Sequence, residues 1–411
     1  LSKKIKILYN YDKGAIMFQK TEILYHLNKK RSQSATSKAI ELVPPDVQRS
    51  VTYFHQSLPG YRPTPLAKLT QLARHLRISD LWVKSEASRF GLKAFKVLGA
   101  SYAIGKMMAK ELKLDSEKFT FEQIVSQASK FRDLTFVTAT DGNHGRAVAW
   151  TANKLGCKAV VYMPKGSSKV RLKAIQNFGA EASIINGNYD DAVRLAAKQS
   201  SEKGWILVQD TSWPGNEEIP INIMQGYITL LTEAFQQLEG EWPSHIFMQA
   251  GVGSLAAALQ AFLCNYRDKS RPFFTVVEPT EAACFYKSIN IADGKPHIVH
   301  GDLDTIMAGL ACGEPSEIAW DILKENADAF IACSDHVAIK GMRVLGNPLE
   351  GDDRVISGES GAVTTGLVYE LLNNSMFNKL AEQLGLGADS RVLVISTEGD
   401  TDPEYYRKVV W

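Results

Sequence analysis

From residue 81 onward, short apolar runs alternate with segments whose apolar residues recur every three or four positions. Apolar runs of about four to eight residues are typical of buried strands, and the wider spacing is typical of amphipathic helices. The expected strands cover 81–84, 135–140, 159–163, 182–186, 205–209, 246–249, 273–277 and 392–396. The expected helices cover 145–155, 168–178, 190–202, 254–265, 280–289 and 360–372, and one more places Val97, Ile104, Met108 and Leu112 on a single face.

This alternation predicts an α/β fold, with a parallel sheet covered by helices on both faces. Ligands bind such sheets beyond the carboxyl ends of strands, where glycine-rich turns lead into helices. The beginning of the chain differs from this pattern. Residues 1–57 are polar and irregular, and we interpret them as a peripheral N-terminal arm. Three prolines within 59–66 favour an extended segment at which the ordered structure begins.

Composition and charge exclude several classes of protein. Hydrophobic residues make up 45% and charged residues 22% of the 411 residues, and the net charge is +2. These values are typical of a globular chain and give no reason to expect nucleic acid or an anionic membrane as a partner. No apolar run reaches the ~18 residues of a membrane span, and the basic N-terminal segment lacks the apolar core of a signal peptide.

The cysteines and histidines indicate the compartment and the metal content. The five cysteines form no C-x-x-C pair, so we expect a cytoplasmic protein with free thiols in preference to a disulfide between Cys284 and Cys312. Apart from His144, which we expect to be structural, the histidines show no metal-ligand spacing. No metal site is therefore predicted.

Candidate chemistry lies at four junctions, and the first is the segment 85–103. Lys96 opens a predicted helix directly after Phe95. Partial desolvation and a nearby helix N-terminus both lower the pKa of an amine, which suits it to carbonyl chemistry. By itself this lysine is weak evidence, because most helix lysines are solvated surface groups.

The second junction, 139–150, places Asp141, Gly142 and Asn143 between a strand and a helix. Such a turn can wrap a ligand, but an ordinary helix cap uses the same residue types. The third junction, 249–259, ends a strand in glycines and opens a long apolar helix. Backbone donors and the positive helix N-terminus suit a phosphate, although the lysine of a P-loop is missing.

The fourth junction, 394–403, ends a strand in Ser396 and Thr397 before Gly399 turns the chain. Hydroxyl groups at such places are usually turn or capping groups. Each junction alone is therefore ambiguous, and only their order along one chain is informative.

Taken in that order, the four junctions resemble those of fold-type-II pyridoxal-phosphate enzymes, the tryptophan synthase β-like fold. The family's F-K-x-x-G-A segment is matched by 95–100, its S-x-G-N-H loop by 140–144 with Thr for Ser, its glycine loop by 251–255 and its S-G-x-G-D-x-D segment by 396–402. The similarity extends from about residue 58 to the C-terminus. It implies two open, mostly parallel sheets flanked by helices, with a large cofactor domain from 1–96 and 212–411 and a small domain from 97–211.

The resemblance also implies a cofactor and the residues that bind it. Pyridoxal 5'-phosphate is expected as a Schiff base on Lys96, with Phe95 packed near the ring and Asn143 bonded to the ring hydroxyl. Ser396 is expected to meet the pyridine nitrogen, and Thr397 takes this place if the alignment slips by one residue. The phosphate is expected in a cup formed by Gly251, Val252, Gly253, Ser254 and Leu255.

Within this fold type the chain is most similar to the diaminopropionate ammonia-lyases, through the segments SRFGLKAFK, TDGNHGRAVAW, DTSW…EIP…IMQGY and VISTEGDTDP. Relatives that act on serine or threonine carry a small residue at the position of Asp141. One departure is Asn216, where the family pattern has an aromatic residue. The implied reaction is α,β-elimination of 2,3-diaminopropionate to pyruvate and two ammonia molecules.

In that reaction Asp141 is the expected base at Cα and Lys96 the second base, so that D and L isomers both react. Asp210 is expected to orient the β-amino group, unless it is a plain strand-end aspartate. Two alternatives remain open: a serine or threonine dehydratase with the same cofactor, and a non-catalytic cofactor-binding regulatory protein. The expected partners are a small amino-acid substrate and a second copy in a homodimer.

Overall fold

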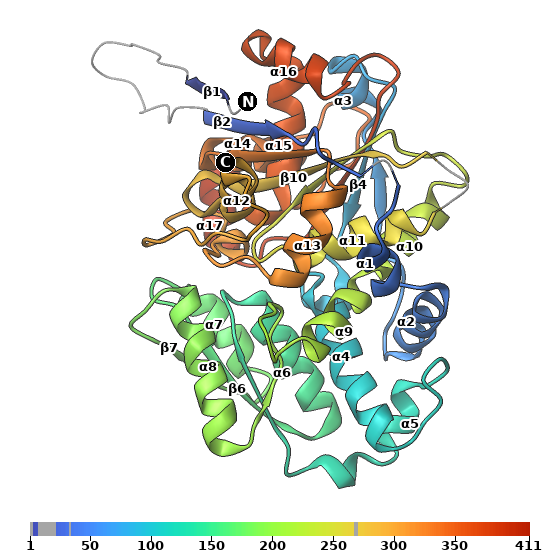
Figure 1. Cartoon of the computed structure of the whole chain (residues 1–411), viewed down its shortest axis with the longest axis vertical. Coiled ribbons are helices and arrows are strands. Elements are labelled where there is room, and N and C mark those ends of the chain that lie inside the picture. Colours follow the sequence, from blue (N-terminus) through green and yellow to red (C-terminus); the bar gives the residue numbers. More distant parts are fainter. Residues whose placement is uncertain (1–2, 7–21, 33, 267–269) are drawn as a thin grey trace.

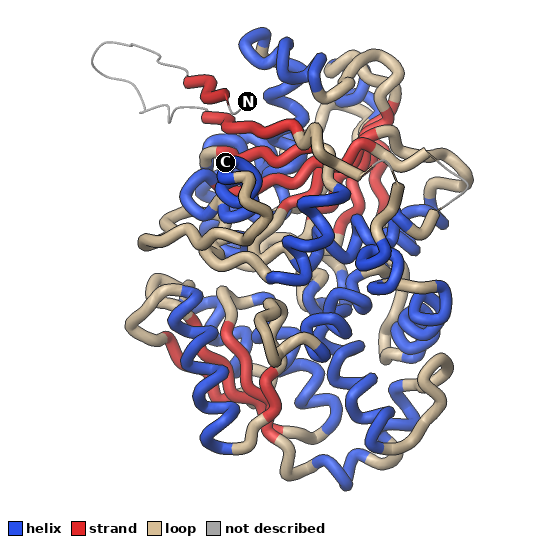
Figure 2. The backbone as a smooth tube through the Cα atoms, in the orientation of Figure 1, coloured by secondary structure: helices blue, strands red, loops and turns tan. Residues whose placement is uncertain are grey.

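The structure is a computed structural model that describes residues 3–6, 22–32, 34–266 and 270–411. Figure 1 shows a larger part that contains both termini, with a smaller part below it. Figure 2 shows that the strands form two separate groups, one in each part. The strands are β1 (Lys3–Lys6), β2 (Glu22–Leu27), β3 (Leu66–Lys68), β4 (Asp80–Ser85), β5 (Thr135–Ala139), β6 (Lys158–Met163), β7 (Glu181–Ile184), β8 (Ile206–Leu207), β9 (His245–Gln249), β10 (Phe273–Pro279), β11 (Ala329–Cys333) and β12 (Arg391–Ser396).

Helices surround both groups of strands. They are α1 (Ser37–Leu42), α2 (Pro45–Ser57), α3 (Thr70–His75), α4 (Lys96–Glu111), α5 (Phe121–Val125), α6 (Asn143–Leu155), α7 (Lys169–Gln176), α8 (Tyr189–Lys203), α9 (Glu218–Tyr227), α10 (Thr229–Gln237), α11 (Ser254–Cys264), α12 (Cys284–Ile291), α13 (Glu317–Asn326), α14 (Asp335–Gly346), α15 (Glu359–Asn373), α16 (Asn378–Gln383) and α17 (Pro403–Val410). Among the described residues, none of these helices is long and apolar enough to cross a membrane.

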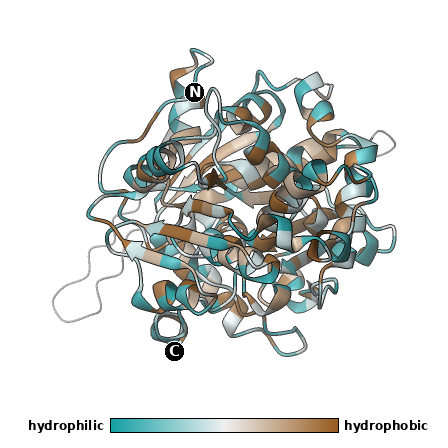
Figure 3. Cartoon of the chain, turned by 90° about the horizontal axis from the view of Figure 1, so that it is seen from below, coloured by the Kyte–Doolittle hydropathy of each residue, from teal (hydrophilic) through white to brown (hydrophobic). Residues whose placement is uncertain are grey.

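The larger sheet has the strand order β1-β2-β11-β10-β9-β12-β4-β3. Its five central strands, from β11 to β4, are parallel, and the outer pairs are antiparallel. Side chains alternate across a strand, so consecutive residues of β12 face different cores. Leu393 and Ile395 belong to one core, and Val392 and Val394 to the other. Figure 3 shows hydrophobic residues mostly in the interior and hydrophilic residues mostly toward the outer turns.

The smaller sheet has the order β7-β6-β5-β8 and is entirely parallel. All four strands lie within 135–207, inside the range expected for the small domain. The residues that follow β5 and β8 leave this parallel sheet at its carboxyl edge, and α4 and α9 lie beside the sheet in Figure 1. A strand was expected over 205–209, but β8 contains only two residues. The ladder ends early because the side chain of Gln209, in place of backbone, accepts from the Ala139 N–H at 2.9 Å.

The interpretation of 1–57 as an irregular peripheral arm is wrong for the part that the structure describes from residue 22 onward. Strand β2 pairs with β11 in the larger sheet. Helix α2 buries Phe54 completely in the main core. Asp46, Arg49 and Gln56 lie on the exposed face of α2 and Phe54 on its buried face, so an amphipathic helix was mistaken for an irregular segment. Of the rest of the expected arm, 3–6 form β1, and 1–2, 7–21 and 33 lie outside the described residues.

Candidate active site

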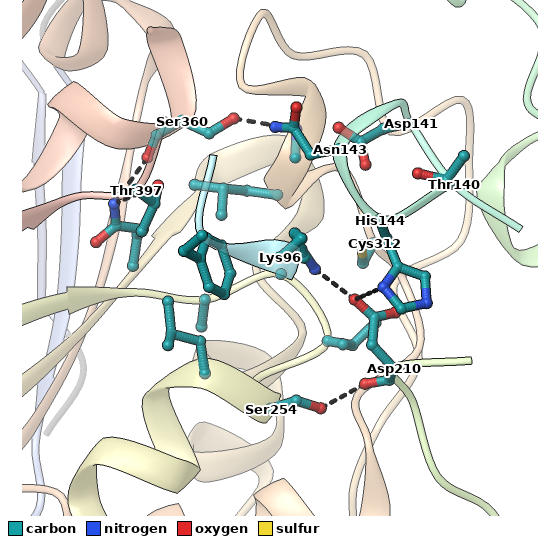
Figure 4. A pocket seen from close by; sticks show the side chains of 18 of the residues that line it. Lys96, Thr140, Asp141, Asn143, His144, Asp210, Ser254, Cys312, Ser360 and Thr397 are labelled. Carbon is teal, nitrogen blue, oxygen red and sulfur yellow. Dashed lines mark hydrogen bonds and ion pairs between the residues drawn. The ribbon is translucent and has the colours of Figure 1, made fainter. Parts of the chain in front are cut away.

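The carboxyl ends of strands from both sheets meet at one pocket. It contains the predicted residues Lys96, Asp141, Asn143, Asp210 and Thr397, together with Phe95 and the glycine segment 251–255. Figure 4 shows that these side chains come from both parts of the molecule and point toward one another. The four junctions identified in the sequence therefore meet in space.

Lys96 is the first residue of α4 and its amine points into the pocket (Figure 4). The amine forms an ion pair with the Asp210 carboxylate. Burial alone would lower the pKa of Lys96, but the attraction of Asp210 outweighs it and raises the pKa above its ordinary value. The expectation of a lowered pKa is therefore wrong for this state of the protein. Gly99 lets α4 approach α9 closely, since a Cβ there would lie 2.5 Å from the ring of Tyr227.

Asp210 is almost fully buried and also accepts hydrogen bonds from other side chains. Its Oδ1 accepts from the Tyr189 hydroxyl at 3.3 Å, and its main-chain carbonyl accepts from Ser254 Oγ at 2.5 Å. Burial acts to raise the pKa of Asp210, but the charge of the Lys96 amine and the hydrogen bonds from Lys96 and Tyr189 lower it to about 2. Asp210 is thus a permanent anion whose present partner is an ammonium group.

His144 belongs to the pocket wall, although only a structural role was expected. Its Nε2 lies 2.8 Å from the carbonyl oxygen of Val208, which can only accept, so Nε2 carries the proton. Nδ1 therefore presents a lone pair, 3.9 Å from Asp210 Oδ2. Burial lowers the pKa of His144, so the ring is neutral.

Asp141 lies on the turn between β5 and α6. Gly142 has φ +151°, and a Cβ there would lie 3.0 Å from the Arg171 side chain, so the turn requires glycine. The Asp141 Oδ2 atom is buried and has no hydrogen-bond partner among the described residues. It is available to a ligand.

The segment before α11 forms a cup that suits a phosphate. Gly253 has φ +91°, and a Cβ there would lie 2.2 Å from the Phe285 ring. At Gly251 a Cβ would lie 3.0 Å from the Gly309 carbonyl oxygen. The first N–H groups of a helix lack intrahelical acceptors and create positive potential, which favours an anion. Unpartnered buried atoms on Gln249, His144 and Asp141 face the same pocket, so its residues fit pyridoxal phosphate.

The two hydroxyl residues at the end of β12 have different environments. Ser396 is directed away from the pocket wall and its hydroxyl donates to Ser357 Oγ at 2.8 Å. Thr397 lines the pocket and accepts from Gln249 Nε2 at 3.1 Å. Of the two residues expected at the pyridine nitrogen, Thr397 therefore faces the pocket and Ser396 does not, because alternation along the strand turns Ser396 to the opposite side; the contact with the nitrogen stays a prediction.

Asn143 is held at both ends of its amide. Its Nδ2 donates to Glu398 Oε2 at 2.5 Å, and its Oδ1 accepts from Arg146 at 3.2 Å. Its contact with a ring hydroxyl stays a prediction. Asn216, the departure from the family pattern, closes a tight turn by donating its N–H to the Trp213 carbonyl at 2.9 Å.

Several lining residues were not foreseen: Tyr189, Gln249, Glu398 and Ser360. Gln249 and Glu398 lie within the recognised segments 249–259 and 396–402, so their position in sequence was a usable signal. Tyr189 and Ser360 begin helices that only the tertiary fold brings to the pocket. All five cysteines, Cys284 and Cys312 among them, are free in the structure.

Comparison with known proteins agrees with this site. Residues 57–398 match a family model described as "Pyridoxal-phosphate dependent enzyme". A diaminopropionate ammonia-lyase from Salmonella typhimurium is 49% identical over 395 residues, which cover 95% of this chain and 98% of the relative. A threonine dehydratase from Escherichia coli is 24% identical over 78% of this chain and 55% of the relative.

A solved structure gives the same result at the level of the fold. The crystal structure of diaminopropionate ammonia lyase from Escherichia coli, in complex with an aminoacrylate-PLP azomethine reaction intermediate, superposes with a TM-score of 0.86. Its sequence is 44% identical, and the match covers 95% of this chain and 97% of that one. The chain therefore belongs to the fold-type-II pyridoxal-phosphate-dependent enzymes and, within them, to the diaminopropionate ammonia-lyase family.

Proposed function

We propose that this chain converts 2,3-diaminopropionate and one water molecule into pyruvate and two ammonia molecules by α,β-elimination. The observation that carries the proposal is the buried ion pair of Lys96 and Asp210 beside the phosphate cup. This pair indicates a place for an ammonium group inside the pocket. 2,3-Diaminopropionate carries an amine at Cβ where serine and threonine carry a neutral hydroxyl, and a buried carboxylate discriminates between the two.

The cofactor-binding residues proposed here are those that surround the pocket. Lys96 would bind the aldehyde carbon, 251–255 would surround the phosphate, Phe95 would pack beside the ring, and Asn143 would donate to the ring hydroxyl. When bound, pyridoxal phosphate supplies a conjugated ring that takes up the charge left at Cα. Because Thr397 accepts from Gln249, its own hydroxyl hydrogen remains for the ring nitrogen. A neutral hydroxyl does not hold that nitrogen protonated, which favours prompt loss of a β substituent.

Three side chains take part in the proposed proton transfers: Asp141 and Lys96 act as bases, and Asp210 acts as an anion. Asp141 removes the Cα proton from one isomer through its unpartnered Oδ2, and Lys96 removes it from the other. Asp210 keeps the β-amino group protonated, so this group departs as neutral ammonia. In the structure the Asp210 carboxylate pairs with the Lys96 amine and has a pKa of about 2, and the β-ammonium group takes the place of that amine as its cationic partner. This division of roles supports turnover of both D and L isomers.

Initial rates of ammonia and pyruvate release test the proposal. We expect kcat/KM for 2,3-diaminopropionate to exceed that for serine by about 100-fold or more, because the serine hydroxyl leaves Asp210 without a cationic partner. Comparable values for the two substrates would identify a serine dehydratase. Saturation with cofactor but no ammonia from either substrate would identify a non-catalytic binding protein.

The proposal also covers the cellular compartment and the oligomeric state of the enzyme. The free thiols suit a reducing compartment, and we place the chain in the cytoplasm as a homodimer. Light scattering coupled to size-exclusion chromatography tests the second point, and a mass of one chain at micromolar concentration would contradict it.

A further inference from the structure

The pocket contains another carboxyl group, Glu398, that the elimination does not use. Glu398 lies just after β12, lines the pocket and is only 2% exposed. Its Oε2 accepts from Asn143 Nδ2 at 2.5 Å, and its Oε1 accepts from the Ser360 N–H at 3.1 Å. Glu398 therefore joins the first residue of α6, in the small part, to the first turn of α15, in the large part.

No cation contacts Glu398 directly among the described residues. Arg171, the nearby arginine from α7, instead pairs with Glu359 of α15 and donates to Thr401 at 3.2 Å. Burial and the negative charge of Glu359 raise the pKa of Glu398 to about 7, against the opposing effect of Arg171. Asp141, on the turn before α6, acts in the same direction as Glu359. The carboxyl group is thus poised between its two ionisation states near neutral pH.

The orientation of Asn143 follows from its neighbours. Arg146, on α6, can only donate, so the atom that it contacts at 3.2 Å must be the Asn143 oxygen. The amide nitrogen consequently faces Glu398. An amide nitrogen carries two hydrogens, and Glu398 accepts one, so the second is free for a ligand in the pocket.

We propose that Glu398 is a positioning residue, which fixes the Asn143 amide toward the bound cofactor and whose ionisation sets the charge at that end of the pocket. The inference rests on the proposed function, since it assigns the pocket to pyridoxal phosphate. It adds a pH-dependent element to a site in which Asp210 keeps its charge.

The visible absorbance of the cofactor-saturated protein, titrated without substrate, tests the proposal. We expect the wild-type band to change with a midpoint near pH 7, and Glu398→Gln to abolish that step. Glu398→Gln is also expected to weaken cofactor binding about tenfold, because a hydrogen bond to a charged acceptor is lost. Asp400→Asn is the matched control, because this carboxylate lies two residues from Glu398, pairs with Lys93 and does not line the pocket. The midpoint of the absorbance titration and the cofactor affinity should both stay as in wild type.

A second variant keeps the test decisive if Glu398→Gln does not fold. The Asn143 amide stabilises the ionised form of Glu398, so Asn143→Ala should raise the midpoint, by about one pH unit. A midpoint that stays unchanged in Asn143→Ala, or a titration that persists in Glu398→Gln, would overturn the inference. Failure of the wild-type protein to bind the cofactor would instead overturn the proposed function.

Discussion

At the scale of single residues, Asp210 links three parts of the pocket. Its side chain pairs with Lys96 and accepts from Tyr189, while its main-chain carbonyl accepts from Ser254 in the phosphate cup. A substitution of Asp210 therefore alters contacts of the lysine, of the start of α8 and of the phosphate cup. Its charge, more than its volume, is what the proposed substrate requires.

Replacement of Asp210 by Asn removes the charge and keeps the shape. We expect kcat/KM for 2,3-diaminopropionate to fall by roughly 10²–10³-fold, since loss of one member of a buried charge pair costs about 2–5 kcal/mol. The value for serine, which has no β-ammonium group, should fall much less. The measurement is the ratio of the two values in initial-rate assays, with the exposed Asp191→Asn as control. An equal loss for both substrates would mean that Asp210 does not contact the β-amino group.

At the scale of elements, the glycines before α11 allow the cup to form. Gly253 has a positive φ and also lies against the Phe285 ring, whereas Gly204 has φ +67° with open space around it. Both positions strain an added side chain through the backbone, but only Gly253 also forces an overlap. Comparing an alanine substitution at Gly204 with one at Gly253 therefore separates the effect of backbone strain from the effect of displacing the cup.

Gly204→Ala should cost about 1 kcal/mol of unfolding free energy, from the left-handed backbone alone. Gly253→Ala should cost roughly 1–3 kcal/mol more because of the overlap with Phe285, and should weaken pyridoxal phosphate binding as well. Urea denaturation and cofactor titration measure the two quantities. Equal effects of the two substitutions on cofactor binding would show that the cup is not formed by this segment.

The elements differ in how far their sequence reveals them. The strands β9 and β12 are short, continuous apolar runs, and their predicted positions agree with the structure to within a residue. The length of strand β8 was overestimated because the Ala139 N–H donates to the Gln209 side chain and so ends the ladder, which no hydrophobic pattern reveals. Thr397 and Ser396 are adjacent hydroxyl residues, so only the direction of each side chain distinguishes them. Tyr189 joins the site through the packing of α8, which lies far from every motif in the chain.

At the scale of the whole molecule, a buried network of charges supports the strand that precedes Lys96. Lys84 of β4 and Arg89 both bind Glu233 of α10, at 2.7 and 2.8 Å, and Glu86 binds Arg89 at 2.8 Å. All four side chains are nearly inaccessible to solvent. The network contains two positive and two negative groups, so loss of one carboxylate leaves a buried positive charge uncompensated.

Glu233→Gln should therefore reduce the unfolding free energy by about 3–5 kcal/mol at neutral pH. Burial acts to raise the pKa of Glu233, but Arg89 and Lys84 lower it to about 2, below the ordinary value of 4.5. A depressed pKa stabilises the fold above the unfolded-state value, and this contribution is lost as pH falls from about 4.5 toward 2. Denaturant titrations at several pH values should show the difference from wild type shrinking in that range. The exposed pair of Lys110 and Glu218 supplies the control, since Glu218→Gln should change stability by less than about 0.5 kcal/mol.

The two sheets meet around the Lys96 amine. The assigned chemistry depends on covalent binding of the cofactor by this amine. Borohydride reduction of the cofactor-saturated protein, followed by mass spectrometry of its peptides, tests this claim most directly. We expect a single phosphopyridoxyl group, on the peptide that contains Lys96, and none in Lys96→Ala. A label on another lysine, or an unlabelled protein after reduction, would contradict the account.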